Sequence, residues 1–177
     1  MPIIIDANCI ANVFDVNCAR HAEFTPVRDW IVSGKGKMVY GGTTYENELR
    51  LLPKYLPIIR FLRESNKVIR GNKTAIDQYQ SQVESKRTDP DFDDPHLVAI
   101  SVVTKCLLIC SEDTRSIKHV KDRKYYPKSF GNLPSYYTSS SNSNLLSDNY
   151  VHQTFKPLTT INRSVQDKFN LIKIKSK

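Results

Sequence analysis

The chain has 177 residues, of which 40% are hydrophobic, and a formal net charge of +8. This length provides one well-buried core but is short for two, so we expect a single domain. No stretch approaches the roughly 18 uninterrupted apolar residues of a membrane span, and the first apolar run, residues 3–5, lacks the positive flank of a signal peptide. Four cysteines, none in a CxxC pair, are typical of reduced structural thiols. The sequence therefore predicts a soluble cytoplasmic protein without membrane association.

Short apolar runs alternate with segments of helical spacing along the chain. In chain order we expect a strand at residues 1–5, helices at 7–14 and 21–32, a strand at 38–40, helices at 43–52 and 55–62, a strand at 67–70, helices at 72–86 and 96–105, a strand at 106–110, a helix at 115–120 and a further strand at 133–137. Such alternation implies right-handed crossovers between parallel strands. The sequence therefore predicts a three-layer α/β/α sandwich with a central, mainly parallel sheet.

Turns and caps separate these elements. Thr43 or Thr44, after two glycines, can cap the helix that follows. The Ser- and Asn-rich residues 139–144 predict a loop, and the last residues are basic with few apolar positions. We expect a core domain at residues 1–125 and a basic, Ser- and Asn-containing extension at residues 126–177, packed on the same domain.

The basic charge is concentrated toward the end of the chain. Residues 1–113 contain 14 Lys and Arg against 15 Asp and Glu, whereas residues 114–177 contain 12 against 3. A segment polarised in this way suits a polyanion, of which nucleic acid is the commonest. A solvated basic tail is an equally good interpretation of the charge alone.

Four acidic residues stand at one kind of place, the end of an apolar strand or the first turns of the next helix. They are Asp6, Glu48, Asp94 and Asp113. The carboxyl ends of parallel strands lie along one edge of a sheet, where open α/β folds place their sites. Carboxylates gathered there repel one another unless a cation neutralises them, and oxygen ligands favour Mg²⁺ or Mn²⁺ over zinc. Taken singly, Asp94 and Glu48 are better explained as helix caps or solvated charges, whereas Asp6 interrupts an apolar run at a strand end. The metal hypothesis therefore depends on all four acids together.

Four short motifs around these acids resemble the PIN-domain nuclease family. They are IIDAN at residues 4–8, YENEL at 45–49, DDPHLVA at 93–99 and LICSED at 108–113. Each motif is degenerate, and their joint order over residues 1 to about 120 makes the resemblance specific. Within the motifs Glu46, Asp93 and Glu112 compete with Glu48, Asp94 and Asp113 as the acid that matters.

The resemblance implies an activity and a site. By this resemblance the four acids bind Mg²⁺ or Mn²⁺ and catalyse hydrolysis of phosphodiester bonds in RNA, usually single-stranded, while Asn8 and Ser111 orient the acids or the scissile phosphate. The expected protein is thus a metal-dependent endoribonuclease. Its role as a toxin, a defence nuclease or an RNA-processing enzyme stays open, as do a homodimer and an antitoxin or regulatory protein as partner.

Further candidates for RNA contact follow the fourth acid. Arg115 and Lys118 come directly after Asp113 and can hold phosphates. His96, beside Asp94, is either a general base or a structural residue at a helix start. The tyrosines that interleave with the basic residues either stack on unpaired bases or belong to the core. They are Tyr125, Tyr126, Tyr136 and Tyr137.

Two other functions compete with the nuclease. The first is a non-catalytic RNA-binding module on the same fold, with the acids serving only as caps. It predicts salt-sensitive binding without metal dependence. The second is a phosphatase of the haloacid-dehalogenase type, which also begins with an acid at a strand end. That family needs a second acid two residues later, where this chain has Asn8.

Overall fold

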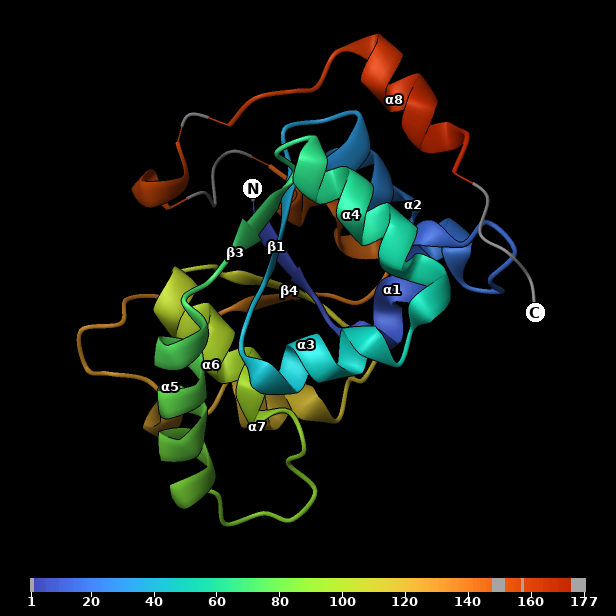
Figure 1. Ribbon diagram of the computed structural model, residues 1–177. Coiled ribbons are helices and arrows are strands. Elements are labelled where there is room, and N and C mark those ends of the chain that lie inside the picture. Colours follow the sequence, from blue (N-terminus) through green and yellow to red (C-terminus); the bar gives the residue numbers. More distant parts are fainter. Residues whose placement is uncertain (1, 148–151, 157, 173–177) are drawn as a thin grey trace.

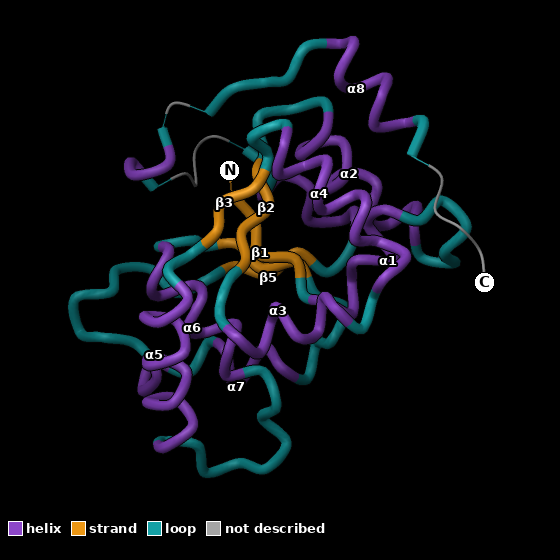
Figure 2. Tube along the Cα trace, in the orientation of Figure 1, coloured by secondary structure: helices purple, strands orange, loops and turns teal. Residues whose placement is uncertain are grey.

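The computed structural model describes residues 2–147, 152–156 and 158–172. A central sheet lies between helices on both of its sides (Figure 1), and the strands gather in the middle of the tube view in Figure 2. This is the three-layer α/β sandwich that the alternation of apolar runs predicts, and the prediction is confirmed. No helix within the described ranges is both long and apolar enough to cross a membrane.

Five strands form one sheet in which every pairing is parallel. In chain order they are β1 (Pro2–Ile5), β2 (Lys37–Tyr40), β3 (Val68–Arg70), β4 (Leu108–Cys110) and β5 (Ser135–Tyr137). Their order across the sheet is β3-β2-β1-β4-β5. The chain therefore adds β2 and β3 on one side of β1 and then crosses over to add β4 and β5 on the other side. Helices cover both faces of the sheet, which is why β1 and β4 are continuous apolar runs.

Eight α-helices are described in the structure. They are α1 (Ile10–Phe14), α2 (His21–Val32), α3 (Thr43–Arg50), α4 (Leu56–Glu64), α5 (Lys73–Ser85), α6 (Pro95–Thr104), α7 (Ser116–Val120) and α8 (Arg163–Asn170). Short 3₁₀ helices lie at Ala7–Cys9, Pro53–Tyr55, Arg123–Tyr125, Ser140–Leu145 and Gln153–Phe155. Right-handed crossovers place α1, α2 and α4 on one face of the sheet and α5, α6 and α7 on the other, as Figure 1 shows. Helix α3 contacts both the 3₁₀ helix before α1 and helix α5.

Helix α6 is the centre of the second helical layer. Residues 95–102 are all buried, because the sheet covers one side of the helix and α5 and α7 cover others. A helix that is apolar around its whole circumference is typical of this position. Leu97, Ala99 and Ile100 are fully buried, whereas Val103 is only partly buried. The buried surface of α6 thus extends over more than one face of the helix.

The start of α3 differs from the sequence-based expectation. The residue before the helix is Gly42, whose φ of 82° favours glycine, and no side chain at this helix start makes a capping hydrogen bond. Asp77 of α5 takes that role, since its carboxylate accepts hydrogen bonds from the backbone N–H and the hydroxyl of Thr43, both at 2.6 Å. The predicted cap by Thr43 or Thr44 is therefore wrong, and α5 holds the first turn of α3 in place.

Residues beyond 125 contribute to the same sheet and core. Strand β5 extends the sheet beside β4, and Phe169 of α8 packs against the rings of Phe14 and Phe61, with centroid distances of 6.2 and 5.7 Å. The buried ammonium of Lys67 donates hydrogen bonds to the carbonyl oxygens of Gly34, Gly36 and Thr159, at 2.8, 3.2 and 3.2 Å. A 3₁₀ helix at Ser140–Leu145 replaces the loop expected at residues 139–144, and the basic last part of the chain contains helix α8.

Candidate active site

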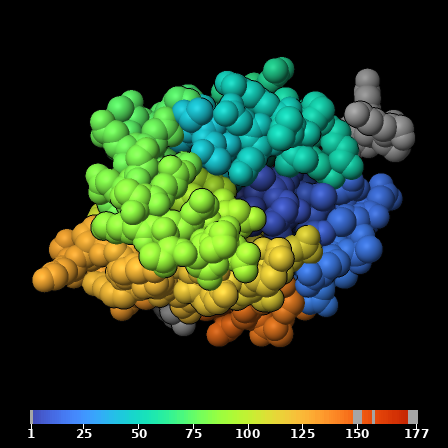
Figure 3. All heavy atoms as spheres, turned by 90° about the horizontal axis from the view of Figure 1, so that it is seen from below, coloured from blue at the N-terminus to red at the C-terminus, as the bar shows by residue number. Residues whose placement is uncertain are grey.

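The four acids singled out in the sequence lie in four separate segments near the carboxyl edge of the sheet. Asp6 follows β1, Glu48 lies in α3 after β2, Asp94 directly precedes α6, and Asp113 lies three residues after β4. The strand order reverses between β1 and β4, and open α/β sheets bind ligands at this kind of topological switch point. Figure 3 views this edge, where dark blue atoms near the amino terminus surface between the cyan α3 and the yellow-green and yellow atoms of residues around 90–115.

A hydrogen-bonded junction joins the ends of β1 and β4. The backbone N–H of Asp6 donates to the Cys110 carbonyl at 2.9 Å, and the hydroxyl of Ser111 donates to Oδ2 of Asp6 at 2.8 Å. The same hydroxyl accepts a hydrogen bond from the N–H of Asp113 at 3.1 Å. The N–H of Asn8 approaches Oδ1 of Asp6 at 3.4 Å. Ser111 and Asn8 therefore both contact the Asp6 carboxylate, and Ser111 also fixes the start of the segment that carries Asp113.

The protonation behaviour of the acids shows that they share one electrostatic environment. The pKa of Asp94 is raised to about 7, mainly by burial and then by the nearby carboxylates of Asp6, Asp93, Glu48 and Asp113 in that order. The pKa of Glu48 is likewise raised to about 7, mainly by burial and then by repulsion from Asp6 and Asp93. The pKa of Asp6 is raised mainly by burial, against the hydrogen bonds from Ser111 and Asn8, which lower it. Asp94 thus lies within electrostatic range of Asp6, Glu48 and Asp113.

Asp113 differs from the other three acids because it has a cationic partner. Arg115 forms a fork with it, from Nε to Oδ1 and from Nη2 to Oδ2, each at 3.0 Å. The hydrogen bonds of Arg115 hold the pKa of Asp113 below its usual value. The Arg115 side chain is itself 86% exposed, so its guanidinium remains accessible to solvent while it holds this carboxylate.

Arg115 and Lys118 border a hollow beside the acids, with a volume of about 570 Å³. The hollow is lined by Pro90, Asp91, Asp93, Arg115, Lys118 and His119. The ammonium of Lys118 is exposed and lies 3.7 Å from Oδ2 of Asp89. The ion pair between Lys118 and Asp89 is weak at such an exposed position. The cations of Arg115 and Lys118 are therefore both available to an anionic ligand that enters the hollow.

The competing acids of the sequence motifs have other partners or higher exposure. Glu46 accepts hydrogen bonds from Nε and Nη2 of Arg70, at 2.9 and 2.5 Å. Glu112 accepts from Nδ2 of Asn12 at 3.0 Å and from Nη1 of Arg20 at 2.9 Å. Asp93 is exposed and acts on Glu48 and Asp94 through its charge. The geometry therefore favours Glu48 over Glu46 as the α3 acid of the cluster.

Two buried aromatic side chains, those of Tyr45 and His96, lie beside Glu48. Tyr45 is fully buried, and its hydroxyl donates a hydrogen bond to the carbonyl of Ile5, directly before Asp6. His96 is 1% exposed, and its ring lies against that of Tyr45. Nε2 of His96 is 3.5 Å from Oε2 of Glu48, but burial lowers the pKa of His96 to about 4. The ring is neutral near neutral pH, so this contact is not an ion pair, and neither ring nitrogen has a hydrogen-bond partner among the described residues.

The donor set is suited to a hard divalent cation, although the acids are not closed around a common point. Among residues 2–147, 152–156 and 158–172, no three His, Cys, Asp or Glu side chains lie close enough as they stand to hold an ion. Asp6, Glu48 and Asp94 nevertheless present only carboxylate oxygens, and every charged neighbour that shifts the pKa of Glu48 or Asp94 is another acid. The residues that could hold Mg²⁺ or Mn²⁺ are therefore these three with Asp113, after rotation of their side chains.

The tyrosines considered for base stacking belong to the core. Tyr125, Tyr126, Tyr136 and Tyr137 are at most 6% exposed. The hydroxyl of Tyr126 donates to the carbonyl of Val120 at 2.7 Å. The stacking hypothesis is therefore wrong for all four, and the core interpretation is right.

No protein-family model matches the chain, and no curated protein or solved structure matches it either. The class of this protein is therefore defined by its own geometry. It is an all-parallel α/β sandwich that carries a cluster of carboxylates at the switch point of its sheet.

Proposed function

We propose that this chain is a metal-dependent endoribonuclease of the PIN type that hydrolyses phosphodiester bonds in single-stranded RNA. The observation that supports it best is the electrostatic coupling of Asp94 to Asp6, Glu48 and Asp113, which come from four separate segments. Carboxylates held so close in a half-buried place destabilise the fold unless a cation or a proton neutralises them. Carboxylates that repel one another at the ligand-binding edge of a sheet are typical of a functional site.

The chain's own residues have distinct parts in this proposal. Asp6, Glu48, Asp94 and Asp113 would hold one or two Mg²⁺ or Mn²⁺ ions. When bound, such an ion lowers the pKa of an attacking water and offsets charge that builds on the phosphate. Ser111 holds Asp6 in one orientation through its hydroxyl, and Asn8 lies at the exposed rim of the same carboxylate.

Two cations are placed to receive the substrate. Arg115 exchanges its fork with Asp113 for a fork with a phosphate, which frees the Asp113 carboxylate for the ion. Lys118 adds a second positive charge on the wall of the neighbouring hollow. Action as a toxin or defence nuclease on cytoplasmic RNA, with an antitoxin or regulatory protein as partner, belongs to the same proposal.

The test is cleavage of a labelled single-stranded RNA with Mg²⁺, with Mn²⁺ and with EDTA. We expect cleavage only with metal. Asp6→Asn and Asp113→Asn should each reduce the rate by more than the roughly 10- to 100-fold loss that follows substitution of an outer-shell partner of a metal site. Glu112→Gln is the matched control next to Asp113, since its partners are Asn12 and Arg20. Full activity of the Asp6 and Asp113 variants would refute the assignment.

A non-catalytic RNA-binding module is the second candidate, and the absence of a closed set of three ligands among the described residues favours it. Titration of Mn²⁺ into the protein, followed by electron paramagnetic resonance, separates the two. The nuclease predicts bound Mn²⁺ that Asp94→Asn weakens. The binding module predicts no bound Mn²⁺ and RNA affinity that is unchanged by EDTA.

A further inference from the structure

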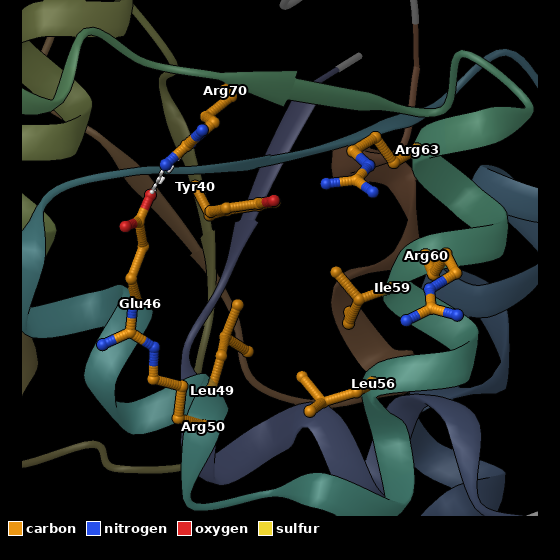
Figure 4. Close-up of a pocket in the computed structure, with 9 residues that line it drawn as sticks. All are labelled: Tyr40, Glu46, Leu49, Arg50, Leu56, Ile59, Arg60, Arg63 and Arg70. Atoms are coloured by element: carbon orange, nitrogen blue, oxygen red, sulfur yellow. Dashed lines mark hydrogen bonds and ion pairs between the residues drawn. The ribbon is translucent and has the colours of Figure 1, made fainter.

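A hollow of about 330 Å³ lies between α3 and α4. We call it the arginine hollow (Figure 4). Its lining residues are Tyr40, Glu46, Leu49, Arg50, Leu56, Ile59, Arg60, Arg63 and Arg70. The α3 residues among them share one side of that helix, whereas Glu48 lies on the opposite side, as the 3.6-residue turn requires. The arginine hollow is therefore separate from the acidic cluster but shares a helix with it.

Positive charge dominates this hollow. Four guanidinium groups face a single carboxylate, that of Glu46, which Arg70 already holds. Arg50 donates to Oδ1 of Asn47 at 3.0 Å. Arg60 and Arg63 are exposed and have no hydrogen-bond or ion-pair partner within the described residues. Two cations in this hollow thus lack a counterion among the residues that the structure describes.

Arg60 and Arg63 line the hollow from α4. Arg60 and Arg63 are three positions apart, a spacing that places them on the same helix face. In Figure 4 the guanidinium of Arg63 extends across the hollow toward the hydroxyl of Tyr40. Leu49 and Ile59 form the apolar part of the wall. Forked donors, a hydroxyl and an apolar wall are together the contacts that a phosphate with its sugar and base requires.

The size of the arginine hollow decides between two kinds of anionic partner. A volume of about 330 Å³ is at the lower end of small-ligand sites, and it suits a nucleotide unit. An acidic helix of another protein would instead need an extended apolar groove with contacts spaced along several turns. The geometry therefore favours RNA.

We propose that the arginine hollow is a second binding site for the backbone of an RNA strand, a few nucleotides away from the phosphate that is cleaved. The inference rests on the proposed nuclease function, because one strand occupies both places. An α-helix with its side chains is roughly 10–12 Å across, so a single strand that crosses α3 connects the arginine hollow with the acidic cluster. Arg60 and Arg63 bind phosphate there, and Arg50 of α3, which also lines the hollow, continues the path.

The experiment compares two double variants of the full chain by fluorescence anisotropy with a labelled single-stranded RNA in EDTA, so that no cleavage occurs. The test variant is Arg60→Gln with Arg63→Gln. The control is Arg163→Gln with Lys168→Gln, which removes the same charge from exposed positions of α8. We expect the test variant to bind roughly 10-fold more weakly at low salt. Its slope of log K against log salt should fall by about 1.4, at about 0.7 for each lost phosphate contact.

The control should change RNA affinity by less than about twofold, and equal affinity of the two double variants would overturn the proposal. Circular dichroism and thermal melting should be unchanged, since both arginines are exposed and without partners among the described residues. Replacement by lysine at both positions should restore the salt slope but only part of the affinity, because lysine retains the charge without the fork.

The outcome also separates this inference from the proposed nuclease. Metal-dependent cleavage whose KM is the same in the test and control variants would reject the arginine hollow and leave the nuclease standing. Absence of cleavage with any metal, together with weaker RNA binding of the test variant, would reject the nuclease and retain the arginine hollow as an RNA site. Polyglutamate that binds to the wild type but not to the test variant, with RNA affinity unaffected, would identify an acidic protein as the occupant and overturn the proposal.

Discussion

The substitution Asp94→Asn should stabilise the metal-free protein at pH 8. The pKa of the Asp94 carboxyl moves from 3.8 to about 7, mainly through burial and then through the neighbouring carboxylates. At about 1.36 kcal/mol per pKa unit this shift corresponds to roughly 4 kcal/mol. Because the side chain is only half-buried, water screens part of it, and we expect about 2 kcal/mol. Asparagine has nearly the same shape and no charge, and the Asp94 side chain makes no capping hydrogen bond that the change would remove.

The sign of this effect depends on pH. The folded chain binds the Asp94 proton more tightly than the unfolded chain does, so the free energy of unfolding falls as pH rises from about 3.8 to about 7. Below that window the carboxyl is protonated in both states, and the substitution should have no effect. Above it the wild type has the full repulsion of the ionised cluster, and Asp94→Asn removes that repulsion.

Urea unfolding in EDTA at pH 4, 6 and 8 measures the difference between variant and wild type. The control is Asp91→Asn, an exposed acid of the same loop, which should change stability by less than about 0.5 kcal/mol. Millimolar Mn²⁺ should then raise the stability of the wild type at pH 8 more than that of the Asp94 variant. An Asp94 variant that is equally stable or less stable than the wild type at pH 8, or a difference that is independent of pH, would refute the reasoning.

Three further substitutions test the supports of the site. Tyr45→Phe leaves the buried Ile5 carbonyl without its donor and should lower the free energy of unfolding by about 1–2 kcal/mol; an unchanged urea midpoint would contradict this. Asp77→Ala removes the cap of α3 and should reduce helix and protein stability by about 1 kcal/mol. It should also weaken Mn²⁺ binding, which Asp77→Asn should largely preserve. Lys67→Met leaves three carbonyls unpaired and should speed proteolysis around Thr159, whereas equal cleavage rates in the two proteins would show that the lysine does not hold the backbone at this residue.

The sheet could be predicted from sequence because its signal is local. The run at residues 3–5 and the run at residues 106–110 are apolar without interruption, since both faces of those strands are covered. Asp6 and Asp113 stand where these runs end, and parallel pairing then places them at one edge. Local pattern and topology together therefore predict that these two acids lie close to one another.

Features that depend on distant parts of the chain could not be predicted in this way. The cap of α3 is Asp77, 34 positions after Thr43, and no local rule selects it over a threonine. Burial of Tyr136 depends on the position of β5 at the sheet edge, next to β4 and beneath later residues. Spacing with basic residues suggested nucleic-acid contact for this ring, but tertiary packing decides its exposure.

The net charge of a segment likewise does not predict where charged side chains gather in the fold. Residues 1–113 are nearly neutral by count, yet the fold gathers Arg50, Arg60, Arg63 and Arg70 around one hollow. A sum of charges over a segment contains no information on where the charged side chains lie in the fold. The local electrostatic potential depends on those positions. Conversely, Arg123, in the basic stretch, donates to the carbonyls of Phe130 and Gly131 at 2.6 and 2.9 Å. Its guanidinium has an internal role that net charge could not reveal.

The bond between Ser111 and Asp6 spans 105 positions of sequence, and this separation has a consequence for biosynthesis. Ribosomes extend a chain at roughly 5–20 residues per second, so Asp6 emerges several seconds before β4 exists. Until then β1 has a neighbour on one side only, and the carboxylate of Asp113, which follows β4, has not been made. The acidic cluster is therefore completed only after most of the chain has been translated, and a nascent fragment that still lies beside ribosomal RNA does not contain the assembled centre.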